Sequence, residues 1–245
     1  MAIITISRGT FTGGLRLAEL MAQGLGYPLV SREQLYTNLQ RNFGFTQEEI
    51  SDILDRIPTG ARFAAERSRG SQLGEKRRRL VAGLTACLCD LVQGGEAVYH
   101  GYAGHLLLPD ISHVLRIRVI APHCMRVKMI VERKAISPME AGRYIDRMDS
   151  ERERWTRFVF GVDWSDPSLF DLTLNLESME MGEAAEIAMV AARLERFRPT
   201  GASLKKTEEL SRSNREAALM AKSYSLVSGA ALSVGNCEHL LKPAL

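Results

Sequence analysis

The sequence predicts an α/β fold, in which a mainly parallel sheet carries helices on both of its faces. Short segments rich in β-branched residues alternate along the chain with longer segments whose apolar residues recur at helical spacing. Such alternation usually builds a parallel sheet, because each helix returns the chain to the edge where the next strand starts. A length of 245 residues, 45% of them hydrophobic, suits one sizeable α/β domain with a lid or an appendage.

The first 26 residues have the pattern of a strand, a glycine turn and a helix. A β-branched run over 2–7 predicts the strand, and the turn over 8–14 contains three glycines. Apolar residues at helical spacing then continue to Gly24 and Gly26, which end the helix. Further strands are expected over 27–30, 97–100, 113–121 and 171–176, and further helices over 46–56, 72–93, 123–134 and 180–197 and from 31 and 137 onward.

The segment that starts at Pro199 has the composition of a linker, Pro-Thr-Gly-Ala-Ser. A polar, helical stretch follows over 205–224, and the last residues include many small ones. We therefore expect a domain over 1–198 and, over 199–245, a linker with a small, mostly helical appendage.

The net charge, the apolar runs and the cysteines argue against a nucleic-acid-binding protein, a membrane protein and a cysteine metal site. A net charge of +3 is too small for a general nucleic-acid-binding protein. No apolar run is long enough to cross a bilayer, and no basic segment followed by an apolar one opens the chain, so we expect a cytoplasmic protein without a membrane partner. Cys87 and Cys89 lie in an apolar run and are expected in the core rather than around a metal.

The turn over 8–14 is the most informative candidate site. A turn between a strand and a helix can point backbone N–H groups and the positive end of the helix at a phosphate. Gly9 and Gly14 have the spacing of the motif G-x-x-x-x-G-K-[ST], but Leu15 and Arg16 replace its lysine and its hydroxyl residue. The pattern alone leaves two interpretations open, a phosphate-binding loop and a connection that only needs glycine dihedral angles.

Two arginine-rich runs are a second candidate for phosphate binding. One covers 76–79, and the other spreads over the helix that starts near 137. At about 100° per residue, Arg143, Arg147, Arg154 and Arg157 of that helix share one face, whereas Arg152 faces nearly the opposite way. Guanidinium groups suit phosphate oxygens, and the alternative explanation is a solvated helix face with ion pairs along it.

Several motifs, taken in order, resemble the cytidylate kinase-like family. The opening strand Ile4-Thr5-Ile6-Ser7-Arg8 with its Thr-Gly-Gly turn is similar to the start of that family, and Ser31-Arg32-Glu33 is similar to its D-R-E segment. The resemblance continues through 98–103, 106–110, 115–121, 137–152, 161–164 and 170–175, and so covers most of the chain up to 197. It implies a P-loop NTPase-like three-layer fold with a helical lid region.

The resemblance also implies a reaction, ATP-dependent phosphoryl transfer to a nucleoside monophosphate with CMP as the model acceptor. ATP and Mg²⁺ would be the cofactors, and nucleotides the ligands. The loop residues expected to hold ATP are Arg8, Gly9, Thr12, Gly13, Gly14 and Arg16, with Thr12 near Mg²⁺. Arg32 and Tyr102 would lie on the acceptor side, and Asp171 would contact the acceptor ribose. Lid arginines, Arg152 with Arg154 or Arg147, would neutralise the transferred phosphoryl group.

The chain departs from the family pattern where catalysis would depend on it. Gly14 stands where orthodox cytidylate kinases have the loop lysine, although the branch of the family that the chain resembles also has glycine there. Tyr102 replaces the arginine of a Gly-Arg turn, and Phe11 replaces a loop glycine. Three interpretations therefore stay open: a CMP-type kinase, a catalytically degenerate nucleotide-binding regulatory or scaffold protein, and a kinase for another small acceptor. Arg8 or Arg16 inside the loop cavity would favour an enzyme, whereas Phe11 filling it would favour a binding protein. A homo-oligomer is left open as well.

Overall fold

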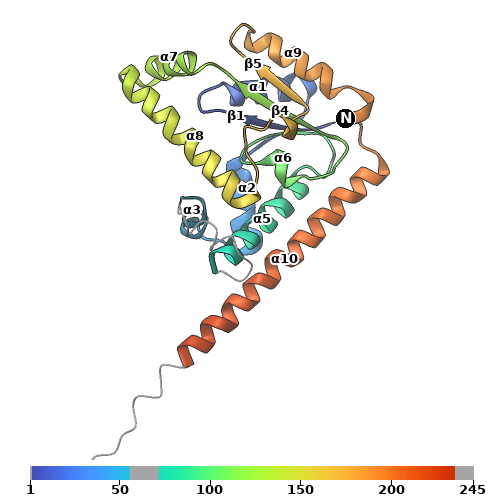
Figure 1. Ribbon diagram of the computed structural model, residues 1–245. Helices are drawn as coiled ribbons and strands as arrows, with labels where there is room; N and C mark the ends of the chain where they lie inside the picture. The colour runs from blue at the N-terminus through green and yellow to red at the C-terminus, as the bar shows by residue number, and fades with distance from the viewer. Residues whose placement is uncertain (1, 56–71, 235–245) are drawn as a thin grey trace, which may run out of the picture.

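The computed structural model describes residues 2–55 and 72–234 (Figure 1). Five parallel strands form one sheet in the order β2-β3-β1-β4-β5. The strands are β1 (Ile3–Arg8), β2 (Leu29–Ser31), β3 (Ala97–His100), β4 (Val114–Ile120) and β5 (Leu172–Asn175). The helices are α1 (Gly14–Leu25), α2 (Arg32–Phe43), α3 (Gln47–Asp55), α5 (Gln72–Leu91), α6 (Gly104–Leu107), α7 (His123–Lys134), α8 (Pro138–Phe160), α9 (Met181–Ala192) and α10 (Gly201–Val234).

Strand β1 separates two apolar cores because its side chains alternate between the two faces of the sheet. Ile3 packs with residues of α2, α3, α5 and α6 on one face. Ile4 and Ile6 pack with residues of α1 and α9 on the other face. Helices therefore cover both faces, which confirms the predicted three-layer α/β fold (Figure 1).

Helices α7 and α8 form a pair beside the sheet that has an apolar centre of its own (Figure 1). Ile130, Ala141 and Ile145 are fully buried in that centre. Helix α8 begins with a capping box between Ser137 and Glu140 and ends at Gly161, whose φ of 78° suits glycine. This pair is the predicted helical lid region.

The parallel register brings the carboxyl ends of the strands to one edge of the sheet. Ile6 lies level with His100, Ser31 lies level with His100, and Arg8 lies level with Val119. The β1–α1 turn leaves from the same edge, which in parallel α/β sheets is the edge that carries ligand sites.

Within the described part of the tail, residues 201–234 form one long helix rather than a loop followed by a short helix. Helix α10 starts at Gly201 and lies along α5, where the Ser211 hydroxyl donates a 2.6 Å hydrogen bond to Asp90 and Arg215 pairs with the same carboxylate. Ala218 is fully buried against the core on that face of the sheet. The expected helix over 180–197 is shorter, because α9 ends at Ala192 and a 3₁₀ turn follows over Glu195–Phe197. No helix within the described residues is both long and apolar enough to span a membrane.

We predict that α10 is part of the same cooperative unit as the sheet. Ala218→Asp places a charge in the core, and we expect it to lower the free energy of unfolding by about 3 kcal/mol and the melting temperature by about 6–12 °C. Thermal unfolding followed by circular dichroism measures the change. Ala217→Asp, at an exposed neighbouring position, is the control. A wild-type melting curve for Ala218→Asp would instead support a separate appendage over 199–245.

Candidate active site

The turn over 8–14 is held in one shape by its glycines and by the start of α9. Gly13 has a φ of 82°, which strains any other residue, and a Cβ there would lie 2.5 Å from Cε of Met181 and displace the end of that side chain. The Thr12 hydroxyl donates a 3.0 Å hydrogen bond to the Gly9 carbonyl inside the turn. The turn is therefore a compact, defined loop at the carboxyl end of β1.

Helix α1 begins at this loop without a side-chain cap. Its N-cap is Gly13, and its first turn contains no acidic residue. Helices α2 and α8, in contrast, begin with complete capping boxes. Unpaired N–H groups and the helix dipole make the start of α1 favourable for an anion.

Arg8 runs across the start of α1 and lines a cleft of about 280 Å³ next to the loop. A Cβ on Gly14 would lie 2.9 Å from Cγ of Arg8, so the glycine leaves the space that the arginine side chain uses. Burial, and the nearby charge of Arg152, lower the pKa of Arg8 to about 10. The guanidinium remains charged at neutral pH, and no carboxylate among the described residues lines the cleft to balance it.

The lid closes one side of the cleft through a cluster around Asp149 of α8. Its Oδ1 accepts hydrogen bonds from the Thr10 backbone N–H (2.9 Å), the Thr10 hydroxyl (2.7 Å) and Nη1 of Arg152 (2.8 Å). Its Oδ2 accepts a 2.6 Å hydrogen bond from Nη1 of Arg126 in α7. Burial would raise the pKa of Asp149, but the hydrogen bonds from Arg126 and Thr10 outweigh burial and lower it. The loop, α7 and α8 thus meet at one ionised carboxylate.

A second cavity, of about 410 Å³, adjoins the cleft through Arg32 and Tyr102, which line both. The Arg32 guanidinium lies 5.3 Å from the ring centre of Tyr102 and 5.9 Å from that of Tyr36, and it pairs with Glu33 at 3.0 Å. Gln40, Gln47 and Thr37 line the rest of the cavity. Amide groups, a hydroxyl and aromatic rings beside a fixed cation suit a small polar molecule with an anionic end.

His100 lies at the carboxyl end of β3 and lines the first cleft. Its Nε2 has no hydrogen-bond partner within the described chain. Burial, reinforced by the charge of Arg8, lowers the pKa of His100 to about 4, so the imidazole is neutral at pH 7. A neutral ring is the form that can sit beside two arginines without adding to their repulsion.

Comparison of the chain with known proteins identifies its family. A model of the cytidylate kinase-like family matches residues 3–178, which is well over half of the chain. The chain belongs to the cytidylate kinase-like family. The match confirms the resemblance inferred from the sequence motifs.

Individual relatives are distant. A cytidylate kinase of Methanopyrus kandleri is 27% identical over 190 residues, which are 77% of this chain and 92% of the relative. A cytidylate kinase of Thermococcus kodakarensis is 22% identical over 201 residues, which are 81% of this chain and 91% of the relative. A crystal structure of an uncharacterized protein from Eubacterium ventriosum is similar with a TM-score of 0.57 at 16% identity, and the match covers 78% of this chain and 97% of that one. That likeness supports the α/β fold.

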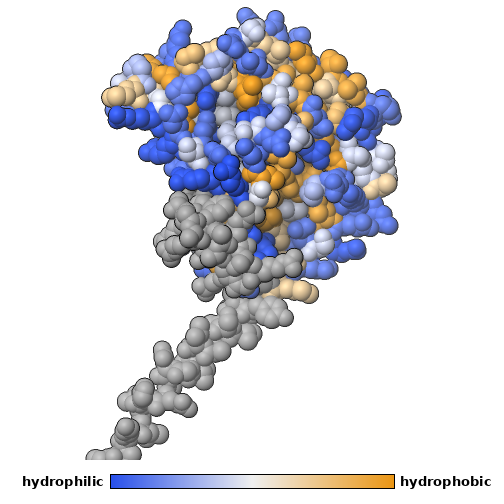
Figure 2. Space-filling model, viewed as in Figure 1, coloured by the Kyte–Doolittle hydropathy of each residue, from blue (hydrophilic) through white to orange (hydrophobic). Residues whose placement is uncertain are grey.

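Most of the residues expected to bind ATP or an acceptor lie together in this cytidylate kinase-like protein. The ones that line the cleft are Arg8, Gly9, Thr12, Gly13, Gly14, Arg32, Tyr102 and Arg152. The helical-wheel expectation grouped four other arginines, but it is Arg152 that faces the loop. Arg147 and Arg154 are exposed and lie outside the lining of the cleft. The face of the molecule shown in Figure 2 is largely hydrophilic over its described part, with scattered apolar residues. Their assignment as lid arginines at the phosphoryl group is not supported by this geometry.

Arg16 and Asp171 also lie away from the cleft. Arg16 points into solvent and pairs with Glu19 one turn further along α1. Asp171 precedes β5 and accepts a 2.9 Å hydrogen bond from the backbone N–H of Arg116, which is level with Thr5 of β1. Because all strands are parallel, Asp171 lies about 10 Å along the strand direction from Arg8. The expected contact of Asp171 with an acceptor ribose therefore lacks support from the structure.

Thr12 is a poor magnesium ligand in this arrangement. Thr12 is 2% exposed, and its hydroxyl already donates a hydrogen bond to the Gly9 carbonyl. Mg²⁺ prefers carboxylates, water and substrate phosphates, and no group of three or more His, Cys, Asp or Glu within the described residues could hold a metal. The side chains of the cleft do not form a metal site by themselves.

Phe11 does not fill the loop cavity. Its ring packs against the lid, 6.2 Å from the ring centre of Tyr144 and 5.8 Å from Nζ of Lys134, although it borders the cleft. Either an arginine or Phe11 was expected to occupy the loop cavity. In the structure it is the Arg8 side chain that lies in the cleft.

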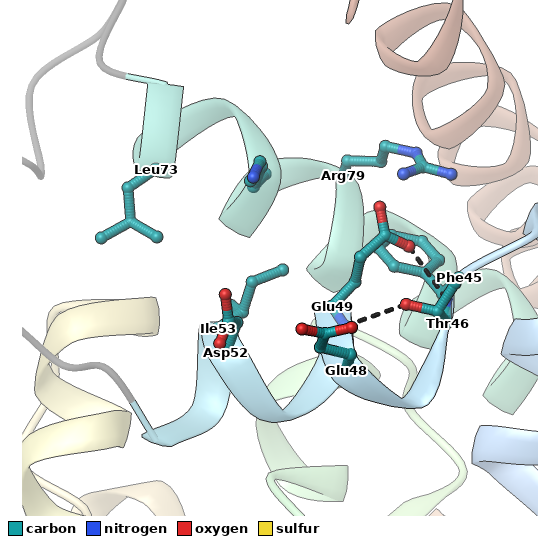
Figure 3. Close-up of a pocket in the computed structure, with 9 residues that line it drawn as sticks. Phe45, Thr46, Glu48, Glu49, Asp52, Ile53, Leu73 and Arg79 are labelled. Carbon is teal, nitrogen blue, oxygen red and sulfur yellow. Dashed lines mark hydrogen bonds between the residues drawn. The ribbon is translucent and has the colours of Figure 1, made fainter.

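The basic run over 76–79 does not line the cleft, and two of its arginines bind backbone carbonyls of neighbouring helices. Arg77 donates a 2.6 Å hydrogen bond to the Phe158 carbonyl, and Arg79 donates one of 2.7 Å to the Phe43 carbonyl. Arg79 borders a separate cavity of about 310 Å³ between α3 and α5, where Glu48, Glu49 and Asp52 outnumber the cations (Figure 3). This acidic lining does not suit a phosphate.

Sequence reasoning gave no individual role to Thr10, His100, Arg126 or Asp149, although Thr10 lies in the turn over 8–14 that it singled out. Two of the other three had a local signal: Asp149 precedes Arg152 by three residues, the spacing of neighbours on a helix face, and His100 ends a predicted strand at the edge that carries the loop. Nothing in the local spacing pointed to Arg126 as a partner of Asp149, because only the packing of α7 against α8 brings the two together.

We predict a pH dependence of stability that arises from His100. In the unfolded chain the imidazole takes up a proton near pH 6.5, whereas in the folded protein it stays neutral down to about pH 4. The unfolded state then binds more protons, so the free energy of unfolding falls as the pH drops from about 6.5 to about 4. His100→Gln should flatten this slope by up to about 1.4 kcal/mol per pH unit.

Urea unfolding between pH 4.5 and 7 measures the slope for the wild type and the variant. His123→Gln, at a histidine of α7 whose side chain is 47% exposed, serves as the control. Equal slopes for wild type and His100→Gln would show that burial does not keep this imidazole neutral.

Proposed function

We propose that the protein transfers a phosphoryl group from ATP to a nucleoside monophosphate, with CMP as the first acceptor to test. The observation that carries this proposal is Arg8, whose charged side chain crosses Gly14 into the cleft at the uncapped start of α1. Arg8 places a positive charge beside a loop in which this chain has Gly14 at the position of the loop lysine of orthodox cytidylate kinases. Membership of the cytidylate kinase-like family supports the same reaction class.

In this proposal the protein positions the two nucleotides and neutralises the charge of their phosphates, which is most of what phosphoryl transfer requires of a protein. ATP supplies the phosphoryl group. The backbone of the loop and Arg8 bind its phosphates, and Arg152 approaches them from the lid side. Arg32 orients the acceptor phosphate from the adjoining cavity, and Tyr102 fixes Arg32 by lying against its guanidinium. Contact between Phe11 and Tyr144 holds the lid against the loop, which helps to exclude water.

A catalytically degenerate nucleotide-binding protein is the second candidate. It is favoured by the lining of the cleft, which contains no carboxylate among the described residues, and by a Thr12 hydroxyl that is committed to the backbone. Such a protein would bind ATP through the same arginines and turn over no acceptor. A kinase for another small acceptor is the third candidate, because Tyr102 stands where the family pattern has an arginine.

The first test is ADP production by the full chain with Mg-ATP and, in turn, CMP, dCMP, UMP and AMP. We expect acceptor-dependent turnover that falls about 10²–10³-fold in Arg152→Ala, because a donor to the transferred group is lost. Arg154→Ala should change turnover by less than about 3-fold, because an exposed lid arginine contributes little. ADP production that does not depend on the acceptor would contradict the proposed kinase activity, and so would ADP production no higher than the blank while ATP still binds. Either result would favour a catalytically degenerate nucleotide-binding protein.

A second test addresses the role of Gly14. Gly14→Ala adds a methyl group where Arg8 now lies, and we expect the dissociation constant for ATP to rise about 10-fold, the cost of one displaced charge-assisted hydrogen bond. Isothermal titration calorimetry measures the constant. Gly182→Ala, in the first turn of α9 with open space around it, is the matched control. An unchanged affinity in Gly14→Ala would exclude Arg8 as the replacement for the lysine.

A further inference from the structure

The cluster around Asp149 has the composition of an anion site that is filled by the protein itself. Its donors come from three elements: Thr10 from the loop, Arg126 from α7 and Arg152 from α8. Thr10 contributes both its backbone N–H and its hydroxyl to the same carboxylate oxygen. A backbone N–H, a hydroxyl and two guanidinium groups converge on the two oxygens of one carboxylate, and these are the donors that proteins use for phosphate.

The positive charge of the cluster exceeds what Asp149 can balance. One carboxylate faces two arginines whose side chains are 13% and 15% exposed, and Arg8 adds a third cation across the cleft. Nε of Arg126 and Nε of Arg152 are buried and have no hydrogen-bond partner within the described chain. Buried donors without partners and an excess of charge both favour the arrival of a further anion.

We propose that Thr10, Arg126 and Arg152 form a binding site for a phosphate group of the nucleotide, which Asp149 occupies in the free protein. The site rests on the proposed function, and it adds residues that the loop pattern does not contain. Asp149 has two effects in this proposal. It positions Arg152 and the loop before a ligand arrives, and its charge competes with the incoming phosphate for the same donors.

The competition predicts opposite effects on binding and on turnover when the charge of Asp149 is removed. Asp149→Asn keeps an oxygen that can accept from Thr10 but loses the negative charge. We expect ATP and inorganic tripolyphosphate to bind about 5-fold more tightly. We also expect turnover with CMP to fall by about 10-fold or more, because Arg152 loses the partner that orients it. A residue with a merely structural role would weaken binding and turnover together.

The experiment is calorimetric titration of the full chain with ATP and, separately, with tripolyphosphate, followed by the turnover assay. Asp146→Asn is the matched control, since Asp146 lies one turn earlier on the same helix, is 71% exposed and pairs only with His123 among the described residues. Its affinities should stay within about 2-fold of the wild type. Thermal unfolding confirms that each variant is folded.

Weaker or unchanged binding of tripolyphosphate by folded Asp149→Asn overturns the inference, and so does a failure of both anions to bind wild type and variant. Tighter binding without turnover of any acceptor supports the anion site while it removes the proposed kinase activity. Should Asp149→Asn not fold, Thr10→Val removes one donor and leaves the carboxylate in place. We then expect tripolyphosphate to bind about 3-fold more weakly, and an unchanged constant overturns the inference.

Discussion

The parallel pairing of β1 with β3 and β4 is the constraint on which the rest of the molecule depends. It fixes Arg8, His100 and the β1–α1 loop at one edge of the sheet. Every group that lines the cleft then comes either from that edge or from a helix that packs beside it. The two cores on either side of β1 bury Ile3, Ile4 and Ile6, and so anchor the strand that leads to this edge.

The fold followed from the sequence because it rests on local patterns. The β-branched run at the start, the glycine turn and the capping residues each specify their element within a few residues, and the Thr46–Glu49 capping box lies where its spacing placed it. The end of α9 was harder, because Ala192 to Phe197 continues the helical pattern while the backbone turns into a 3₁₀ segment. The length of α10 was also missed, since Pro199 to Ser203 has the composition of a linker and still starts a helix one residue after Thr200.

The candidate site was predictable only in part. Loop residues could be named because they are contiguous, whereas Arg32 and Tyr102 could be named only because their segments resemble motifs of the family. A helical wheel shows which arginines share a face of the helix, but it does not show which face packs against the rest of the protein. It therefore favoured the exposed stripe over Arg152, which faces the loop. Asp171 shows the same limitation for strands, because its position along the sheet depends on the register of β5 with β4.

The close packing of Arg8 on Gly14 bears on how such proteins are recognised. A pattern that demands lysine at the start of the helix passes over any chain in which an arginine at the end of the preceding strand fills the same volume. In this chain the strand arginine goes with glycine at position 14, because a side chain there would start 2.9 Å from Cγ of Arg8. Pairs of substitutions at these two places, rather than either residue alone, would trace how the loop diverged within the family.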